Sequence, residues 1–283
     1  MQWREGLLER LAASVPGGYF ALGEAASEPT ALAGLAMRAN GNVDAARLAA
    51  DWLRNHQSEE GSVGVSASQS TPCWPTSLAI LLWQTMDDPD KYAAPIAKGV
   101  EWALREKGTT QEHRPTIGHD TMLIGWSWAA NTHSWLEPTA MFVMALKGLG
   151  LSWHPRTREG VRLLVDRLLP HGGCNCGNTI VLGQELLPHV QSTGIAMMAL
   201  AGESDPDPRI ELSLQYLEQE LSGETTTASL CYGLMGLSAH LRSPADRFAW
   251  LESASQRSSR QGLSAYKLAL IALASTTEYP FGT

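Results

Sequence analysis

The stretch SWLEPTAMFVMAL, residues 134–146, predicts a buried helix that opens on a carboxylate. From Thr139 onward its side chains are almost all apolar, and a helix that is apolar on every side is buried on every side. Pro138 suits the start of such a helix. Glu137 stands at this start, in front of the apolar run. The same letters, EPTA, occur earlier at residues 28–31.

The pattern of residues 139–146 recurs along the chain. A threonine or serine heads each run of Ala, Leu and Met, at intervals of 34 to 63 residues, and the runs begin at Thr30, Thr76, Thr139, Thr193, Thr227 and Ser264. Repeats of this length that each hold one apolar segment are typical of arrays of helical hairpins. The threonine or serine suits the N-cap of the buried helix.

Each apolar run follows a more amphipathic segment. DAARLAADWLRNHQ (44–57), YAAPIAKGVEWALREK (92–107) and RTREGVRLLVDRLL (156–169) carry charges at helical spacing, as expected for helices with one wet face. Glycine-rich loops follow them, and glycine commonly ends a helix. The unit is therefore an outer helix, a glycine turn and an inner helix. Six such hairpins predict an all-α fold, an α/α toroid formed by residues 1–283 as a single domain.

Composition excludes several classes of partner. The chain has 283 residues, 44% of them hydrophobic, with a net charge of −8 and no basic cluster, which argues against nucleic acid and anionic membrane surfaces. It contains no stretch of 18 uncharged apolar residues, so no transmembrane segment is expected. The four cysteines and the N-terminus, which lacks the apolar run of a signal peptide, predict reduced thiols and a cytoplasmic location.

A family resemblance rests on WLRNHQSEEGSVG, residues 52–64. This stretch resembles the QW repeat of the squalene cyclase and protein prenyltransferase superfamily, in which an aromatic residue and Leu precede Gln, then Gly and an aromatic. Trp52, Leu53, Gln57 and Gly61 fill these places, and Val63 replaces the final aromatic. The resemblance implies an α/α toroid with a central cavity. It also implies that a second subunit or a homo-oligomer is a candidate assembly.

The resemblance assigns a role to Glu137. In class II terpene cyclases a DxDD motif directly precedes the Thr-Ala of an inner helix, and alignment on Thr-Ala places Glu137 on the catalytic aspartate. The flanking aspartates are absent here. An apolar cavity raises the pKa of a carboxyl group, so Glu137 would be the proton donor. His133 would orient it, and Asp120, beside His119 in an inserted loop, would face the cavity mouth.

The inner wall would bind an apolar, isoprenoid substrate. Aromatic faces attract cations, which the intermediates of such a cyclisation are. The expected lining is Trp74, Trp126, Trp128, Trp135, Met141, Phe142, Met197 and Tyr232. A simpler interpretation of Glu137 also exists, since Glu-Pro at a helix start satisfies free N–H groups. The second EPTA, at Glu28, favours this simpler interpretation.

Zinc is the alternative to a cofactor-free site. Cys174 and Cys176 form a CxC pair, His189 follows them, and Cys231 lies one repeat later. Thiolates and imidazoles suit zinc, but the cysteines also fit as replacements for the aromatics of a degenerate QW repeat. Ser229 stands where the zinc histidine of the prenyltransferases would be, which argues against their usual chemistry.

Three functions follow from these patterns. The first is a terpene cyclase-like enzyme, an isomerase or lyase that cyclises or isomerises an isoprenoid chain without a cofactor. The second is a non-catalytic toroid that binds a lipid or a partner protein, because a fold alone does not fix a function. The third is a zinc-dependent activity like that of prenyltransferases or lanthipeptide cyclases.

Overall fold

The computed structural model describes residues 2–112, 116–204, 206–260, 262, 264–277 and 279–281. Within these ranges the chain forms 12 helices that alternate between an outer and an inner layer. The outer helices are α1 (Gln2–Ala12), α3 (Val43–Asn55), α5 (Pro89–Arg105), α7 (Pro155–Asp166), α9 (Pro208–Glu220) and α11 (Arg247–Arg260). The inner helices are α2 (Ser27–Ala39), α4 (Thr76–Trp83), α6 (Leu136–Gly148), α8 (Val190–Leu200), α10 (Thr227–Ala239) and α12 (Ala265–Ala274).

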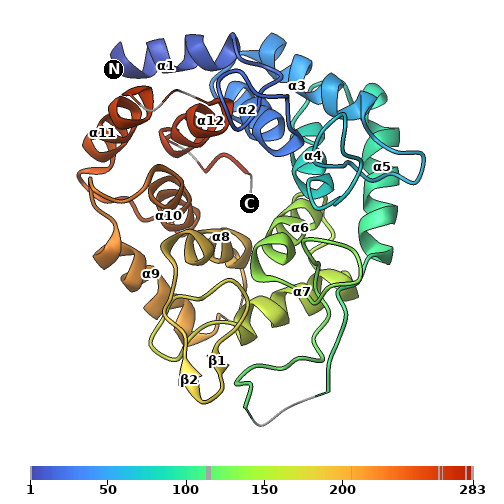
Figure 1. The fold of residues 1–283 in the computed structure, drawn as a ribbon, viewed down its shortest axis with the longest axis vertical. Helices are drawn as coiled ribbons and strands as arrows, with labels where there is room; N and C mark the ends of the chain where they lie inside the picture. The colour runs from blue at the N-terminus through green and yellow to red at the C-terminus, as the bar shows by residue number, and fades with distance from the viewer. Residues whose placement is uncertain are drawn as a thin grey trace.

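The inner helices form a closed ring. Each packs against the next in chain order, and α12 packs against α2 (Figure 1). The outer helices surround this ring, so the predicted all-α fold, an α/α toroid of six hairpins, is confirmed. Among the described residues, no helix combines the length and the apolar character that crossing a membrane requires.

Burial differs between the two layers as the sequence predicted. All eight residues of α4 are buried, and so are nine consecutive residues of α2, 29–37. The outer helix α3 buries Ala45, Ala46, Ala49, Ala50 and Leu53, which share one face, and leaves the other face exposed. The inner layer is therefore the core, and the outer layer separates it from water.

Ser264 is the N-cap of α12, as the sequence suggested, whereas the repeated threonines are not N-caps. The helices α2, α6 and α8 begin three residues before their threonines, with Ala26, Trp135 and His189 as N-caps. The threonine hydroxyl instead bonds to the preceding loop: Thr139 Oγ1 accepts from the Trp126 N–H at 3.0 Å and donates to the Trp126 carbonyl at 3.3 Å. The same pair of bonds recurs at Thr30, Thr76 and Thr193. The threonine thus fixes the loop to the inner helix.

The earlier helix start brings both EPTA glutamates inside a helix. Glu28 and Glu137 are the second residues of α2 and α6, and the prolines after them are the third. A proline costs no hydrogen bond there because the first four N–H groups of a helix have no intrahelical acceptor. Each glutamate therefore lies in the first turn, where the helix dipole favours a negative charge.

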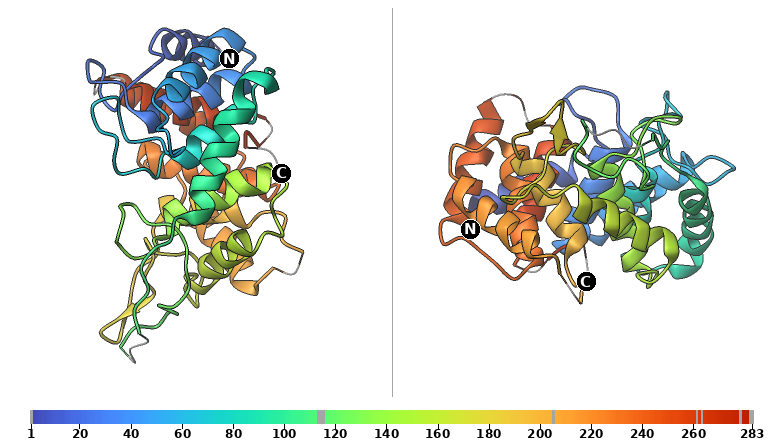
Figure 2. Two further views of the ribbon diagram at one scale, coloured as in Figure 1. Left: turned by 90° about the vertical axis from the view of Figure 1, so that its right-hand side faces the viewer. Right: turned by 90° about the horizontal axis from the view of Figure 1, so that it is seen from below.

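A long insertion separates α5 from α6. It packs beside a short hairpin of β1 (Ile180–Val181) and β2 (Gln184–Glu185), because the Gly118 N–H donates to the Ile180 carbonyl at 3.1 Å. Together the two segments project from one side of the ring (Figure 2). Within the described ranges this hairpin is the one sheet, and the other β-pairings are isolated bridges.

Candidate functional site

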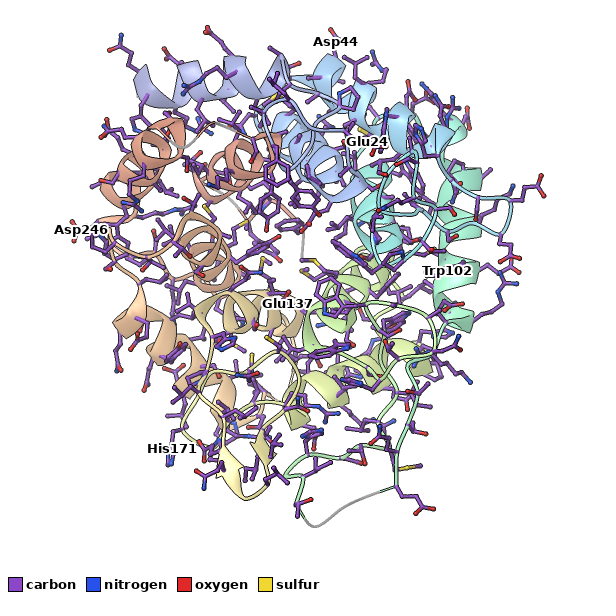
Figure 3. The ribbon with its side chains drawn as sticks, viewed as in Figure 1. Glu24, Asp44, Trp102, Glu137, His171 and Asp246 are labelled. Atoms are coloured by element: carbon purple, nitrogen blue, oxygen red, sulfur yellow. The ribbon has the colours of Figure 1, made fainter. Side chains whose placement is uncertain are left out.

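The two EPTA glutamates meet at the rim where the inner helices begin. Glu137 lies at the centre of the ring (Figure 3). Its negative charge acts on Glu28, raising the pKa of that carboxyl group. Glu28 and Glu137 come from α2 and α6, which are separated by α4 in the ring. The ring therefore brings two carboxyl groups 109 residues apart in sequence into one electrostatic site.

Glu137 is held by the start of α8. The Ser192 hydroxyl donates to Glu137 Oε1 at 2.9 Å, and Gln191 also bonds to this carboxyl group. Burial is the main cause that raises the pKa of Glu137, while Ser192, His189 and Gln191 act in the opposite direction. Glu137 is thus a carboxyl group whose protonated form is favoured by its surroundings, as an acid catalyst requires.

Glu28 is the more perturbed of the two groups. Burial raises its pKa to about 7, although the Tyr19 hydroxyl, which donates to Glu28 Oε2, acts to lower it. Near neutral pH a carboxyl group of this pKa is present in both protonation states. Glu28 can therefore accept a proton as readily as donate one.

Three tyrosines surround the carboxyl pair. The Tyr19 and Tyr266 rings lie 5.4 Å apart, and the Tyr232 hydroxyl is hydrogen-bonded to Tyr266. The charges of both Glu28 and Glu137 act on Tyr232 and Tyr266. The site is therefore aromatic as well as acidic, and its residues come from α2, α6, α8, α10, α12 and the loop before α2.

The structure does not bring His133 or Asp120 to Glu137. His133 stacks on Trp135 at 4.5 Å and lines a separate cavity of about 200 Å³ with His119 and Arg167. Asp120 is exposed, and its Oδ1 accepts from the Met122 N–H at 2.8 Å, which stabilises a turn of the insertion. Neither residue is among the groups that act on the Glu137 carboxyl group. Both lie in the insertion, which bonds to α7 through the Asp120 N–H and Asp166.

The predicted tryptophan wall lines two cavities whose linings do not include the glutamates. Trp74, Trp126 and Trp128 line a cavity of about 720 Å³ together with Phe142, and Trp135 lines the smaller cavity with His133. Trp126 is fully buried, donates to the Ala103 carbonyl at 2.9 Å and stacks on Phe142. Met141 and Met197 are buried in the core. Of the predicted lining residues, Tyr232 is the one that interacts with the carboxyl pair.

The candidate zinc ligands do not form one cluster. Cys176 Sγ lies 3.5 Å from His189 Nδ1, whereas Cys174 is fully buried against Thr193 and burial raises the pKa of its thiol to about 12. Cys231 is also buried, and its pKa is raised by burial. Over the described part of the chain, no three His, Cys, Asp or Glu side chains are placed to share a metal ion.

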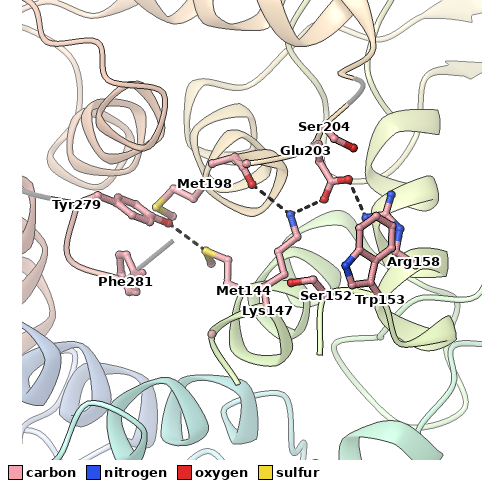
Figure 4. A pocket seen from close by; sticks show the side chains of 13 residues that line it. Met144, Lys147, Ser152, Trp153, Arg158, Met198, Glu203, Ser204, Tyr279 and Phe281 are labelled. Carbon is pink, nitrogen blue, oxygen red and sulfur yellow. Dashed lines mark hydrogen bonds and ion pairs between the residues drawn. The ribbon is translucent and has the colours of Figure 1, made fainter. Parts of the chain in front are cut away.

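The opposite rim of the ring carries side chains from near the end of the described chain. Tyr279 and Phe281 pack beside Met144 and Met198, and the Tyr279 hydroxyl contacts Met144 Sδ at 3.5 Å (Figure 4). Beside them Lys147 Nζ bonds to the Ala199 carbonyl at 2.8 Å and pairs with Glu203 at 2.6 Å. This lysine satisfies carbonyls at the end of α8, a role favoured by the helix dipole. These side chains line a cavity of about 320 Å³ at this rim.

Comparison with known proteins gives structural matches and no sequence matches. No family model matches the chain, and neither does any curated protein. Among solved structures the chain is similar to type II terpene cyclase MstE from Scytonema, in a single-substitution variant bound to its substrate geranylgeranyl dihydroxybenzoate. The TM-score is 0.58 at 14% identity, and the match covers 92% of this chain and 79% of that one. A wild-type glycosidase matches with a TM-score of 0.58, 12% identity, and coverage of 100% and 98%.

A protein from Actinoplanes matches similarly, with a TM-score of 0.58, 15% identity, and coverage of 91% and 80%. The shared fold is the α/α toroid. The resemblance to the terpene cyclase toroid is thereby confirmed for the fold, and at these identities it extends no further. The site must therefore be interpreted from its own residues.

Sequence reasoning missed four members of the site. Ser192 and Gln191 precede the threonine of α8, as Glu137 and Pro138 precede that of α6, so alignment of the repeats could have placed them on the same rim. Tyr266 had no such signal, because its approach to Glu28 depends on the closure of α12 onto α2. Tyr19 lies nine residues before Glu28, in the loop that Thr30 holds to α2. Glu28 was taken as a structural repeat of the motif, whereas the structure makes it the companion of Glu137.

Proposed function

We propose that the protein is an acid-initiated cyclase or isomerase that acts on an isoprenoid or similar apolar chain. The observation that carries this proposal is Glu137, a carboxyl group of raised pKa at the centre of the ring, in the first turn of a buried helix. The similarity to a terpene cyclase is consistent with it. The chemistry requires no metal and no redox cofactor.

In the proposed mechanism Glu137 transfers its proton to a carbon–carbon double bond of the substrate. Ser192 holds Oε1, which leaves Oε2 to carry the proton. The carboxylate formed is stabilised by the N-terminal dipole of α6 and by the Ser192 hydroxyl. The new carbocation faces the rings of Tyr19, Tyr232 and Tyr266, whose π electrons stabilise a cation that water must not reach.

The reaction ends when the cation loses a proton. Glu28 is suited to accept it because its pKa of about 7 leaves a fraction of the group ionised at neutral pH. One proton enters the substrate from Glu137 and one leaves it to Glu28, so no proton is gained or lost overall. Proton exchange with water then resets both carboxyl groups.

The experiment is incubation with prenyl diphosphates and prenylated aromatics of several chain lengths, followed by analysis for cyclised or isomerised products. Glu137→Gln should lower turnover by at least about a hundredfold, because a general acid contributes that much. Glu24→Gln is the matched control, since Glu24 is an exposed glutamate on the loop before α2. Equal product formation by wild type and Glu137→Gln would show that Glu137 is not the acid.

A glycosidase is the second candidate, and the carboxyl pair is the observation that favours it. Glycosidases place one protonated and one ionised carboxyl group on either side of the bond they cleave. Glu137 and Glu28 have different environments, which favour different protonation states of the two carboxyl groups. Aromatic rings, which are also present here, commonly pack against the faces of sugars. Release of the aryl group from a panel of aryl glycosides, lost in Glu28→Gln and in Glu137→Gln, would establish this function in place of the first.

Binding without turnover would support the third interpretation, a non-catalytic toroid. An isoprenoid that binds equally well to wild type and Glu137→Gln, and that neither protein converts, would indicate a lipid-binding role. The zinc-dependent alternative requires ligands beyond Cys176 and His189, the one candidate pair in contact. Elemental analysis of the purified protein tests it directly.

A further inference from the structure

The cavity of about 720 Å³ is separate from the carboxyl pair. It lies between the loop before α4, the end of α5 and the segment 126–130, toward the outer layer of the ring. Figure 3 shows Trp102, a lining residue of this cavity, on the outer helix α5, and it shows Glu137 at the centre of the ring. Its volume is in the range of small-molecule sites. The function proposed above does not use this cavity.

Aromatic rings form its walls. Trp74 and Trp128 meet edge to face at 4.8 Å, and Trp102 lies 6.1 Å from Phe142. All three tryptophans are half-buried, so part of each ring faces the cavity. Their contacts with one another and with Phe142 hold these rings in place without a ligand, which reduces the cost of binding one.

The rim of the cavity is acidic. Glu59, Glu60 and Glu106 line it, against a single cation, Lys107. Glu59 and Glu60 are exposed, whereas Glu106 is half-buried. The charges of Glu106 and Glu60 reach the wall, where they add to burial in raising the pKa of the Cys73 thiol. The lining of the cavity therefore carries more acidic than basic side chains.

One wall already displays the chemistry that such a cavity supports. The guanidinium of Arg156 lies 4.4 Å from the centre of the Trp126 ring, so a cation stacks on a tryptophan of this cavity from within the protein. Tryptophan is the best aromatic partner for a cation, and quaternary ammonium groups are bound by cages of such rings. Trp74, Trp102 and Trp128 offer comparable surfaces to a cation that enters from solvent.

We infer that this cavity is a second binding site, specific for a small organic cation with an alkylammonium group. The three half-buried tryptophans contact the alkyl groups and the charge, and Glu106 with its two neighbours supplies the negative potential. The site is independent of the carboxyl pair, so it binds its ligand whether or not Glu137 is intact.

Calorimetric titration with choline tests this inference. The comparison ligand is the neutral isostere in which carbon replaces the nitrogen of choline, and it should bind at least about tenfold more weakly because it lacks the cation–π attraction. Trp102→Leu and Glu106→Gln should each weaken choline binding several-fold, and added salt should weaken it further. Glu137→Gln should leave the choline affinity unchanged.

Trp153→Leu is the matched control, because Trp153 is 81% exposed and lies on the opposite rim. It should bind choline as wild type does. Thermal unfolding of each variant shows whether it is folded. If Trp102→Leu does not fold, Glu106→Gln still tests the inference. Equal affinity for choline and its neutral isostere would overturn the inference in favour of an apolar pocket. Absence of choline binding at millimolar concentration would also overturn it.

Discussion

At the scale of single residues, the repeated EPTA motif has two roles that the sequence could not separate. As the second residue of a helix, Glu28 or Glu137 is favoured by the helix dipole, which explains why the motif suits any inner helix. The structure adds that these two copies interact at the ring centre. The sequence predicted Glu137 through its position before Thr-Ala, but the pairing depends on the closed ring and could not be read from spacing.

The raised pKa of Glu28 predicts a pH dependence of stability. The folded state holds this proton more tightly than the unfolded state, so the group stabilises the fold fully below its ordinary pKa and loses this effect as pH rises through about 7. Between about pH 5 and about pH 8, wild type should lose up to about 3 kcal/mol of unfolding free energy relative to Glu28→Gln. Denaturant titrations at the two pH values measure this difference.

Glu24→Gln serves as the control for that experiment. Glu24 is exposed, and hydrogen bonds from Ser68 lower its pKa. Glu24→Gln should therefore lose unfolding free energy between about pH 5 and about pH 8 as wild type does. Parallel stability curves for wild type and Glu28→Gln would mean that Glu28 titrates as an ordinary exposed carboxyl group.

The threonine bond to the preceding loop gives a second prediction at this scale. Thr139→Val keeps the shape of the side chain but leaves the buried Trp126 N–H without its acceptor. The unfolding free energy of Thr139→Val should be about 1–3 kcal/mol below that of wild type. Thr139→Ser keeps the hydroxyl, so its unfolding free energy should stay close to that of wild type. Thr110→Val, at an exposed position of the insertion, should have little effect. If Thr139→Ser lost as much unfolding free energy as Thr139→Val, the effect would come from packing of the threonine methyl group and not from the hydrogen bond.

At the scale of helices, the sequence predicted the order and the layers but misplaced the helix starts. The repeated Thr30, Thr76, Thr139 and Thr193 look like N-caps because that is the usual place for threonine before an apolar run. In the structure they serve the loop, and three of the four helices extend a further turn toward their N-termini. The loop partner of each threonine lies 13 or 19 residues earlier, beyond the range of a local pattern.

Close approach of two inner helices depends on glycine. A Cβ atom on Gly194 of α8 would lie 2.4 Å from the Tyr232 carbonyl oxygen of α10. Gly194→Ala should therefore force these helices apart and cost about 1–3 kcal/mol or more. Gly6→Ala is the matched substitution in α1, where a Cβ would meet nothing within 4 Å. It should stabilise the protein by about 0.5–1 kcal/mol.

Thermal unfolding of both alanine variants measures the contrast. The prediction requires a lower midpoint for Gly194→Ala and a midpoint at or above that of wild type for Gly6→Ala. If Gly194→Ala unfolded at the wild-type temperature, α8 and α10 could not be packed as closely as the structure places them.

At the scale of the whole molecule, the closure of α12 onto α2 joins the first and last hairpins. Removal of any hairpin would expose apolar faces of both neighbours, so the ring should unfold as one cooperative unit. Nine of the ten tryptophans lie before residue 154, so tryptophan fluorescence reports mainly on the first half of the ring. Far-ultraviolet circular dichroism reports on all the helices.

The two signals should give one coincident thermal transition. This result would support the prediction that residues 1–283 form a single domain. Two transitions, or a fluorescence midpoint that differs from the dichroism midpoint, would instead indicate that the halves of the ring unfold separately. The sequence pattern alone could predict the ring but not the path of the insertion, which places Trp126 and Trp128 with Trp102 of the outer helix α5 around one cavity.

Tyr279 and Phe281 bear on the route by which a substrate of the proposed function would reach the glutamates. They occupy the end of the ring at which the inner helices stop, beside Met144 and Met198. If the substrate of the proposed function reaches the glutamates from the other end, a converted molecule must leave along the path by which its precursor arrived. We therefore expect product to compete directly with substrate and its escape to limit the overall rate.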